Sequence, residues 1–338
     1  MKAVWRCAIL SAALEASALA AGAQAPSDIA EARRLINAGE PATALAKLRT
    51  LNGEGDRNRE MQLALLTGVA HYHAGDVTKA IEALAPVADR FAADSIERRE
   101  AEQVLGLSLF LAGRFAEALP RLQSTRRWAG ENSELALALG QTYVHTQQPD
   151  AAREVFAALF RFPADSAAAH LIAAQMMIRL EQEPQAEKEL GRALDKDPRL
   201  PVANMLLGQI ALFRGRFAEA VTFTEREVAI NPANAAAFSQ LGDAFGRQGK
   251  WDEAIAVLQK SIWLNPYYSA PYILLGRAYT KKDQHAAAEG MFRRAIEYDP
   301  NNRTAHYLLA QLLQQLGRAE EAKREFEIAE RLRGARGA

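Results

Sequence analysis

The chain has 338 residues, and its 41 lysines and arginines equal its 41 aspartates and glutamates, so the formal net charge at pH 7 is zero. Proteins that bind nucleic acid through its phosphates usually carry a basic surface, and this sequence has neither a basic excess nor a basic patch with interleaved aromatic residues. The single cysteine, Cys7, lies in a leader that we expect to be removed, so no disulfide is expected in the mature chain.

Residues 1–23 are typical of a secretory signal peptide. A short basic start, residues 1–6, is followed by the apolar run Cys7–Leu14, and the small residues 21–23 before Gln24 fit a cleavage site. Glu15 interrupts the apolar stretch, and the alternative is an alanine-rich helix that packs against the next segment. The stretch is too short to span a bilayer. We therefore expect a periplasmic or secreted bacterial protein, with a cytoplasmic location as the alternative.

From residue 25 to residue 336 the sequence repeats itself nine times. Small residues recur in pairs twelve positions apart, and from Ala118 onward successive pairs are 34 residues apart. In chain order the pairs are Ala32/Ala44, Gly68/Ala80, Gly106/Ala118, Gly140/Ala152, Ala174/Ala186, Gly208/Ala220, Gly242/Ala254, Gly276/Ala288 and Ala310/Ala322. A period of this length is typical of stacked supersecondary units rather than of one globular core.

Each repeat is predicted to form two antiparallel helices, A and B. Apolar residues recur at three- and four-residue steps on both sides of a central glycine. A glycine that ends helix A recurs as Gly39, Gly75, Gly113, Gly215, Gly249 and Gly317. Asp-Pro or Asn-Pro ends helix B at Pro198, Pro232, Pro266 and Pro300. The paired small residues are expected where helices A and B approach closely, since a larger side chain would force them apart.

These features resemble the tetratricopeptide repeat. The copy at 269–302 matches that family's pattern best, with Leu275-Gly276 and Tyr279 on helix A, Ala288 and Phe292 on helix B, and the final Pro300. The other copies lie at 25–58, 61–94, 99–132, 133–166, 167–200, 201–234, 235–268 and 303–336, before a tail at 337–338. The resemblance implies an all-α fold, an α-solenoid in the form of a right-handed superhelix of about nine helix-turn-helix units.

Some copies depart from the family's pattern. Thr224 and Glu227 interrupt the apolar side of helix B in the copy at 201–234. Two insertions, Arg59–Glu60 and Ser95–Arg98, are short enough to lengthen helices or turns, and they could mark off the first two repeats.

In this family helix A lines a concave groove, and the resemblance implies that unit positions 2, 5, 9, 12 and 13 face a partner. The partner-binding residues expected on that basis are Leu65, Tyr72, Leu107, Phe110, Leu137, Gln141, Leu171, Gln175, Met205, Gln209, Phe213, Asp243, Arg247, Arg277 and Lys281. The expected lining is apolar in its middle and cationic toward its end, which suits an extended or helical peptide whose acidic group is held by Arg277 and Lys281. The alternative is that many of these apolar side chains pack between neighbouring helices.

No catalytic motif is found in the sequence. It lacks Gly-x-Gly-x-x-Gly, a phosphate-binding glycine loop and Gly-x-Ser-x-Gly, and His71 and His73 are two apart, so they face different sides of a helix. We therefore expect no enzyme activity, no cofactor and no metal. The expected role is a scaffold that binds a protein or peptide, without nucleic acid or a membrane span, in assembly or regulation of a cell-envelope complex such as a secretion, pilus or polysaccharide-export machine. The alternatives are a cytoplasmic adaptor or co-chaperone, and an accessory subunit of an enzyme whose catalytic chain is separate.

Overall fold

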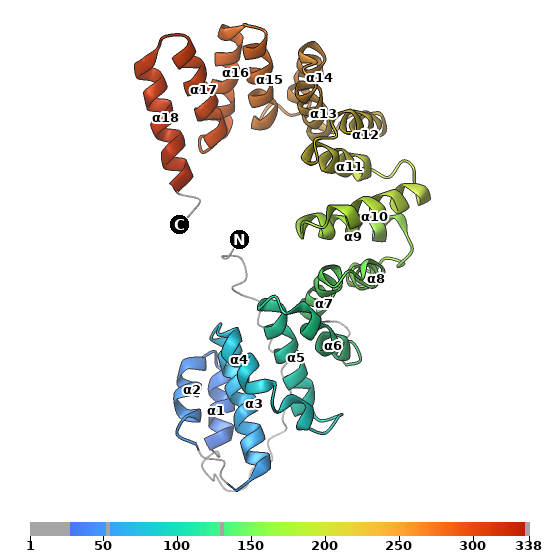
Figure 1. The fold of residues 1–338 in the computed structure, drawn as a ribbon, viewed down its shortest axis with the longest axis vertical. Helices are drawn as coiled ribbons and strands as arrows, with labels where there is room; N and C mark the ends of the chain where they lie inside the picture. Colours follow the sequence, from blue (N-terminus) through green and yellow to red (C-terminus); the bar gives the residue numbers. More distant parts are fainter. Residues whose placement is uncertain (1–27, 52–54, 129–131, 335–338) are drawn as a thin grey trace. The chain divides into compact units, whose positions relative to one another are not determined.

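The computed structural model describes residues 28–51, 55–128 and 132–334. In these ranges the chain forms eighteen α-helices, one short 3-10 helix and no strand (Figure 1). The all-α helical-repeat solenoid predicted from the sequence is confirmed. The predicted signal peptide at 1–23 and the tail at 337–338 lie outside the described residues.

The helices alternate in the chain as A and B helices of nine repeats. Their bounds are α1 Asp28–Asn37, α2 Pro41–Leu48, α3 Arg57–His73, α4 Val77–Leu84, α5 Ile96–Leu111, α6 Phe115–Thr125, α7 Ser133–His145, α8 Pro149–Leu159, α9 Ala167–Arg179, α10 Glu183–Lys196, α11 Ala203–Phe213, α12 Phe217–Ile230, α13 Ala235–Arg247, α14 Trp251–Leu264, α15 Ser269–Lys281, α16 His285–Tyr298, α17 Arg303–Gln315 and α18 Ala319–Gly334. The 3-10 helix, η1, spans Ala88–Arg90.

The described chain divides into two compact units, one up to Ala112 and one from Gly113 onward. Unit 1 contains α1 to α5, and unit 2 contains α6 to α18. The division lies within the third repeat rather than at the insertion Ser95–Arg98. Both insertions lengthen helices: Arg59–Glu60 lies in the first turn of α3, and the Ser95 hydroxyl caps α5 by accepting from the backbone N–H of Arg98 at 3.0 Å.

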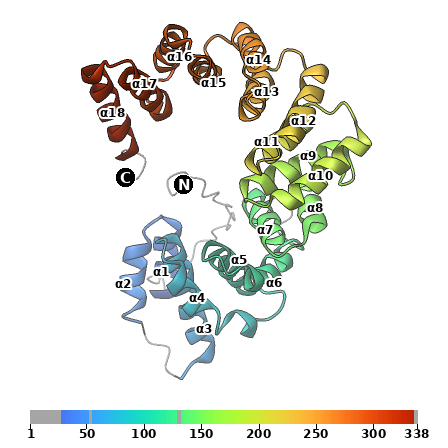
Figure 2. The ribbon, with the colours of Figure 1, turned by 45° about the horizontal axis from the view of Figure 1, so that its top comes forward.

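Within unit 2 the two helices of a repeat lie side by side as a hairpin, as α13 with α14 and α17 with α18 show in Figure 2. The small paired residues lie at the contact. A Cβ atom on Gly276 would lie 2.4 Å from the Phe292 ring on α16, and one on Gly242 would lie 2.4 Å from Leu258 on α14. Because the interior is close-packed, no side chain fits at these glycines unless the facing side chain or its helix shifts. The predicted role of the small residues is confirmed.

The turn after helix A requires a left-handed residue. All six glycines predicted to end helix A have φ between 72° and 81°. In three repeats the equivalent turn holds Gln147, Glu181 or Asp283, with φ of 61°, 59° and 57°. A side chain in this region of backbone space costs roughly 1–2 kcal/mol. The helical hairpin therefore keeps its turn geometry even where glycine is absent.

Helix A usually begins with a side-chain cap, but α11 and α15 begin without one. Asn132, Ser166, Asn234 and Asn302 each accept a hydrogen bond from the backbone N–H three residues on. The equivalent position before α11 is Leu200, which has no acceptor, and Pro201 follows it. The helix starts later, at Ala203, after Val202 with the unusual φ of 75°.

The missing cap is supplied by helix B of the same repeat. Glu227, on α12, is 0% exposed, and its carboxylate accepts from the backbone N–H of Val202 at 2.9 Å and of Met205 at 3.4 Å. Thr224, one turn earlier, is also buried and donates to the Ala220 carbonyl at 2.7 Å. Thr224 and Glu227 depart from the family's pattern, but both polar groups are satisfied and α12 is continuous.

Candidate functional site

The candidate site is the exposed side of the A helices in unit 2. Unit positions 5, 9 and 13 are four residues apart, so they lie on one side of each helix. These positions on α7, α9, α11, α13, α15 and α17 form the A-helix face. Most of the partner-binding residues expected from the sequence lie on this face.

Phe213 is the most exposed large apolar side chain on this face, at 79%. It ends α11, where Gln209, one turn earlier, is exposed and Met205, two turns earlier, is half-buried. The other repeats of unit 2 provide an internal comparison, because they hold polar or basic residues at the same position: His145, Arg179, Arg247, Lys281 and Gln315. Packing of the repeat therefore does not require an aromatic ring there.

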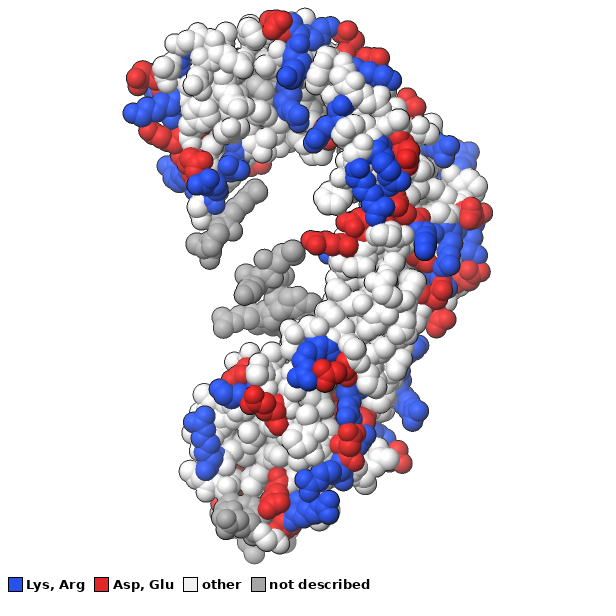
Figure 3. All heavy atoms as spheres, in the orientation of Figure 1, with Lys and Arg blue, Asp and Glu red and all other residues white. Residues whose placement is uncertain are grey.

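Positive charge gathers toward the C-terminal end of the face. Arg247, Arg277 and Lys281 are exposed on α13 and α15. Arg247 pairs with Asp243 at 3.3 Å between Nε and Oδ1, whereas the described part of the chain offers no ion-pair partner to Arg277 or Lys281. Both side chains are therefore free to hold an acidic group. On the side of unit 2 seen in Figure 3, basic and acidic residues are otherwise interspersed.

Amide and apolar side chains occupy the N-terminal end of the face. Gln141, Gln175 and Gln209 share unit position 9 on α7, α9 and α11, and Gln141 and Gln175 are half-buried. Leu137 and Leu171 precede the first two of these glutamines by one turn and are also half-buried. An amide both donates and accepts hydrogen bonds. This part of the face can therefore contact both the backbone and the apolar side chains of a ligand.

The residues expected in unit 1 are less accessible. Leu65 is 1% and Leu107 is 4% exposed, so neither side chain can reach a partner in this structure. They pack against neighbouring helices, which is the alternative already raised for apolar residues of helix A. Tyr72 and Phe110 are half-buried, and the Tyr72 ring lies edge-on to His73 with 5.5 Å between centroids.

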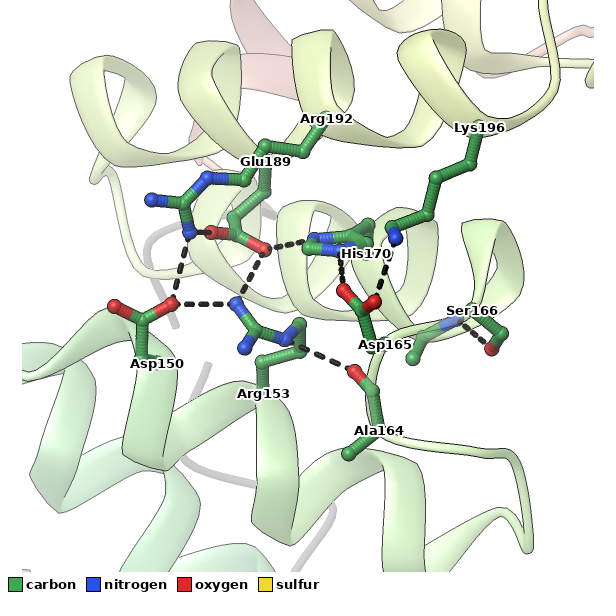
Figure 4. A network of polar contacts seen from close by, with 10 residues as sticks. Asp150, Arg153, Ala164, Asp165, Ser166, His170, Glu189, Arg192 and Lys196 are labelled. Carbon is green, nitrogen blue, oxygen red and sulfur yellow. Dashed lines mark hydrogen bonds and ion pairs between the residues drawn. The ribbon is translucent and has the colours of Figure 1, made fainter.

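A second polar cluster, which the sequence did not indicate, joins α8, α9 and α10 (Figure 4). Glu189 is its centre and is 1% exposed. Its carboxylate lies 2.7 Å from His170 Nδ1, 2.7 Å from Arg192 Nη1 and 3.5 Å from Arg153 Nη1. The same two arginines bind Asp150, at 2.6 and 2.8 Å. The buried charge is thus fully compensated, as a buried carboxylate requires.

The cluster borders an open hollow of about 390 Å³. Asp165 lines it between Lys196 Nζ, at 2.7 Å, and His170 Nε2, at 3.4 Å. The hydrogen bond from Lys196 holds the pKa of the Asp165 carboxyl below its usual value, and that from Arg153 does the same for Asp150. Asp150 and Asp165 are paired with cations of the same cluster. The cluster therefore links α8, α9 and α10 to one another.

The histidine–glutamate pair His170 and Glu189 recurs four repeats later. His306 Nδ1 lies 2.6 Å from Glu325 Oε2, and His306 Nε2 donates to the Pro300 carbonyl at 3.0 Å. His306 is 136 residues after His170, as Glu325 is after Glu189, which is four periods of 34. Repetition of a histidine and a glutamate at whole periods is the sequence signal that could have revealed both pairs.

Comparison with known families agrees with the helical hairpins. Models of the tetratricopeptide repeat match residues 29–95, 109–176, 178–235, 237–266 and 280–332. This chain is a tetratricopeptide repeat protein. Such proteins are generally non-catalytic scaffolds that bind protein partners. No helix in the described ranges has both the length and the apolar character needed to cross a membrane.

The search of curated proteins returned no match. Among solved structures, this tetratricopeptide repeat protein is similar to MamA from Desulfovibrio magneticus RS-1, at 20% identity over 52% of this chain and 98% of that chain, with a TM-score of 0.47. It is also similar to a thermophilic tetratricopeptide repeat protein, TTC0263 from Thermus thermophilus, at 22% identity over 48% and 90%, with a TM-score of 0.43. A chain of the APC/C hetero-tetramer Cut9–Hcn1 matches at 15% identity over 82% and 55%, with a TM-score of 0.45.

Proposed function

We propose that this protein is a non-catalytic scaffold that binds an extended or helical segment of a partner protein along the A-helix face of unit 2. The observation that carries the proposal is Phe213, a 79% exposed aromatic ring at a position where the neighbouring repeats hold polar residues. A solvent-exposed ring of this kind is a typical anchor of a protein–protein contact.

The chemistry of the face defines the segment that it would bind. Phe213 and Met205 offer contact to an apolar side chain, and Gln175 and Gln209 offer donors and acceptors. The unpaired cations on α15 favour a segment whose following residues include an aspartate, a glutamate or a C-terminal carboxylate. Such a ligand combines apolar anchors with charge-assisted hydrogen bonds.

We also propose that the protein is exported and acts in a cell-envelope complex, such as a secretion, pilus or polysaccharide-export machine. The support for this placement is the signal-like sequence of residues 1–23. Sequencing the N-terminus of the protein isolated from its own cells tests it. A mature chain that begins at Gln24 supports export, whereas an intact Met1 favours the cytoplasmic adaptor. An active enzyme that co-purifies in fixed ratio would favour an accessory subunit.

Binding is tested with a partner first identified by crosslinking and mass spectrometry of the native envelope fraction. In titration against that purified partner, Phe213→Asp is expected to weaken affinity at least about tenfold, because a charge replaces a central apolar anchor. The helical circular dichroism should not change. Phe160→Asp is the matched control, since Phe160 is also an exposed aromatic residue but lies at the end of α8. Equal affinity of Phe213→Asp and wild type contradicts the proposal.

A further inference from the structure

We propose that unit 2 has a second protein-binding surface at the C-terminal end of α14, and that it receives an acidic segment of a partner protein together with an apolar side chain of that segment. This surface, the α14-end surface, consists of Lys260, Trp263, Tyr267 and Arg294. It belongs to the B helices and the loop after α14, so it is separate from the A-helix face.

The aromatic residues of this surface are unusually exposed and held in place. Trp263 is 73% exposed and Tyr267 is 76% exposed. Lys260 Nζ lies 4.0 Å from the centroid of the Trp263 ring, and the Tyr267 ring lies edge-on to Tyr298 with 5.6 Å between centroids. Contacts of this kind restrict the rings before any partner arrives. A pre-ordered ring loses less entropy on binding.

The other repeats show that folding does not require these rings. At the repeat position of Trp263, α10, α12 and α16 carry Asp195, Ala229 and Glu297. At the position of Tyr267, the neighbouring repeats carry Asp165, Arg199, Ala233 and Asn301. All seven residues are exposed, and six of them belong to repeats with the same helical hairpin and the same closing proline. The aromatic pair in this repeat therefore adds an apolar contact surface to a position that is otherwise solvated.

The charge around the rings selects an acidic partner. Arg226, Lys260 and Arg294 occupy one repeat position on three successive B helices and are exposed. Arg226 lies over Phe223 at 5.8 Å from the ring centroid, as Lys260 lies over Trp263. Only Arg294 of the three has a carboxylate partner among the described residues, Glu297 at 2.9 Å. Lys260 thus lies against the Trp263 ring without a neutralising acid, which is complementary to aspartate or glutamate.

A protein segment fits this surface better than a lipid bilayer does. Two aromatic rings give little apolar area for insertion, whereas tryptophan, tyrosine and arginine are the side chains that dominate protein contacts.

The test uses the mature full-length protein and two fluorescein-labelled synthetic peptides of twelve residues. One peptide has a central phenylalanine flanked by glutamates, and the other has lysines in place of the glutamates. In fluorescence anisotropy at low salt, the acidic peptide is expected to bind and the basic peptide is not. Trp263→Ala and Lys260→Glu should each lower the affinity for the acidic peptide at least about tenfold. Trp263 is exposed, so circular dichroism should be unchanged.

The controls separate this proposal from the proposed function. Phe213→Asp should leave binding at the α14-end surface unchanged, and a loss there would assign the peptide to the A-helix face and overturn the inference. Equal binding of both peptides would also overturn it, as would an affinity for the acidic peptide that Trp263→Ala does not lower. Trp263-dependent sedimentation with phosphatidylserine vesicles would favour a membrane instead. A dimer that Trp263→Ala dissociates would favour a second copy of the chain.

Discussion

Gly276 and Gly290 lie in the same hairpin, but their surroundings differ. Gly276, on α15, faces the buried Phe292 ring, and an added Cβ would lie 2.4 Å from it. Gly290, on α16, has no atom within 4 Å of an added Cβ and has an ordinary helical backbone. One glycine sets the distance between two helices, whereas the other only lowers helix propensity.

We expect Gly276→Ala to lower the free energy of unfolding by about 1–3 kcal/mol, because the extra methyl group overpacks the contact with Phe292. Gly290→Ala should raise it by about 0.5–1 kcal/mol, since alanine loses less backbone entropy in a helix. Urea denaturation of both variants checks this pair. Effects of the same sign would show that close packing at Gly276 does not limit the hairpin.

His145 shows how packing alters a titration. Its ring is stacked on Phe115, with 3.9 Å between centroids and 5° between planes. Burial lowers the pKa of His145 below its ordinary value of 6.5. The folded protein then resists a proton that the unfolded chain accepts, so the contribution of this residue to stability is present above pH 6.5 and is lost as the pH falls from 6.5 through the lower pKa of the folded protein.

An NMR titration is expected to place the pKa of His145 below 6.5 in the wild type and closer to 6.5 in Phe115→Ala, because the exposed imidazolium is better hydrated. A His145 pKa that does not move on removal of the Phe115 ring would contradict the burial argument.

Among the helices, α11 begins differently from its equivalents. Leu200 and Pro201 stand where α7, α9, α13 and α17 begin with an asparagine or serine cap, and Val202 has a left-handed backbone. Glu227 replaces the missing cap from α12. Two helices of one repeat are therefore joined by a buried carboxylate as well as by apolar packing. Because α11 carries Met205 and Phe213, this cap also positions part of the A-helix face.

We expect Glu227→Ala to cost about 1–3 kcal/mol of stability, because it leaves the partly buried backbone N–H of Val202 without a partner. Glu225→Ala, an exposed glutamate on the same helix, should stay within about 0.5 kcal/mol of wild type. Val202→Gly should stabilise by roughly 1 kcal/mol, since glycine adopts a positive φ freely. Thermal unfolding of the three variants measures these changes in stability. Equal effects of the two glutamate variants would show that the cap contributes nothing.

Over the whole chain, the 34-residue spacing was sufficient to predict the order of the helices and their turns. Gly276 and Ala288 marked the contact between A and B helices, and Pro300 marked the end of a repeat. The reason is that a repeat packs mainly on itself and its neighbours, so its constraints recur in the sequence. The division after Ala112 was not predicted, because no change of composition accompanies it.

The candidate site was less predictable than the fold. An apolar residue on helix A either faces solvent, as Phe213 does, or packs against a neighbouring helix, as Leu65 does, and hydrophobic periodicity does not separate the two. The environment of Glu189 was also hidden, because glutamate is usually solvated. Its burial depends on Arg153, Arg192 and His170, which come from different helices.

The cap on α11 comes from a residue that the ribosome adds 25 positions after the one it caps. At a synthesis rate of about 5–20 residues per second, the nascent chain holds Val202 for roughly 1–5 s before Glu227 is joined to it. During that interval the first turn of α11 lacks its acceptor, so translation must run through α12 before this repeat can close.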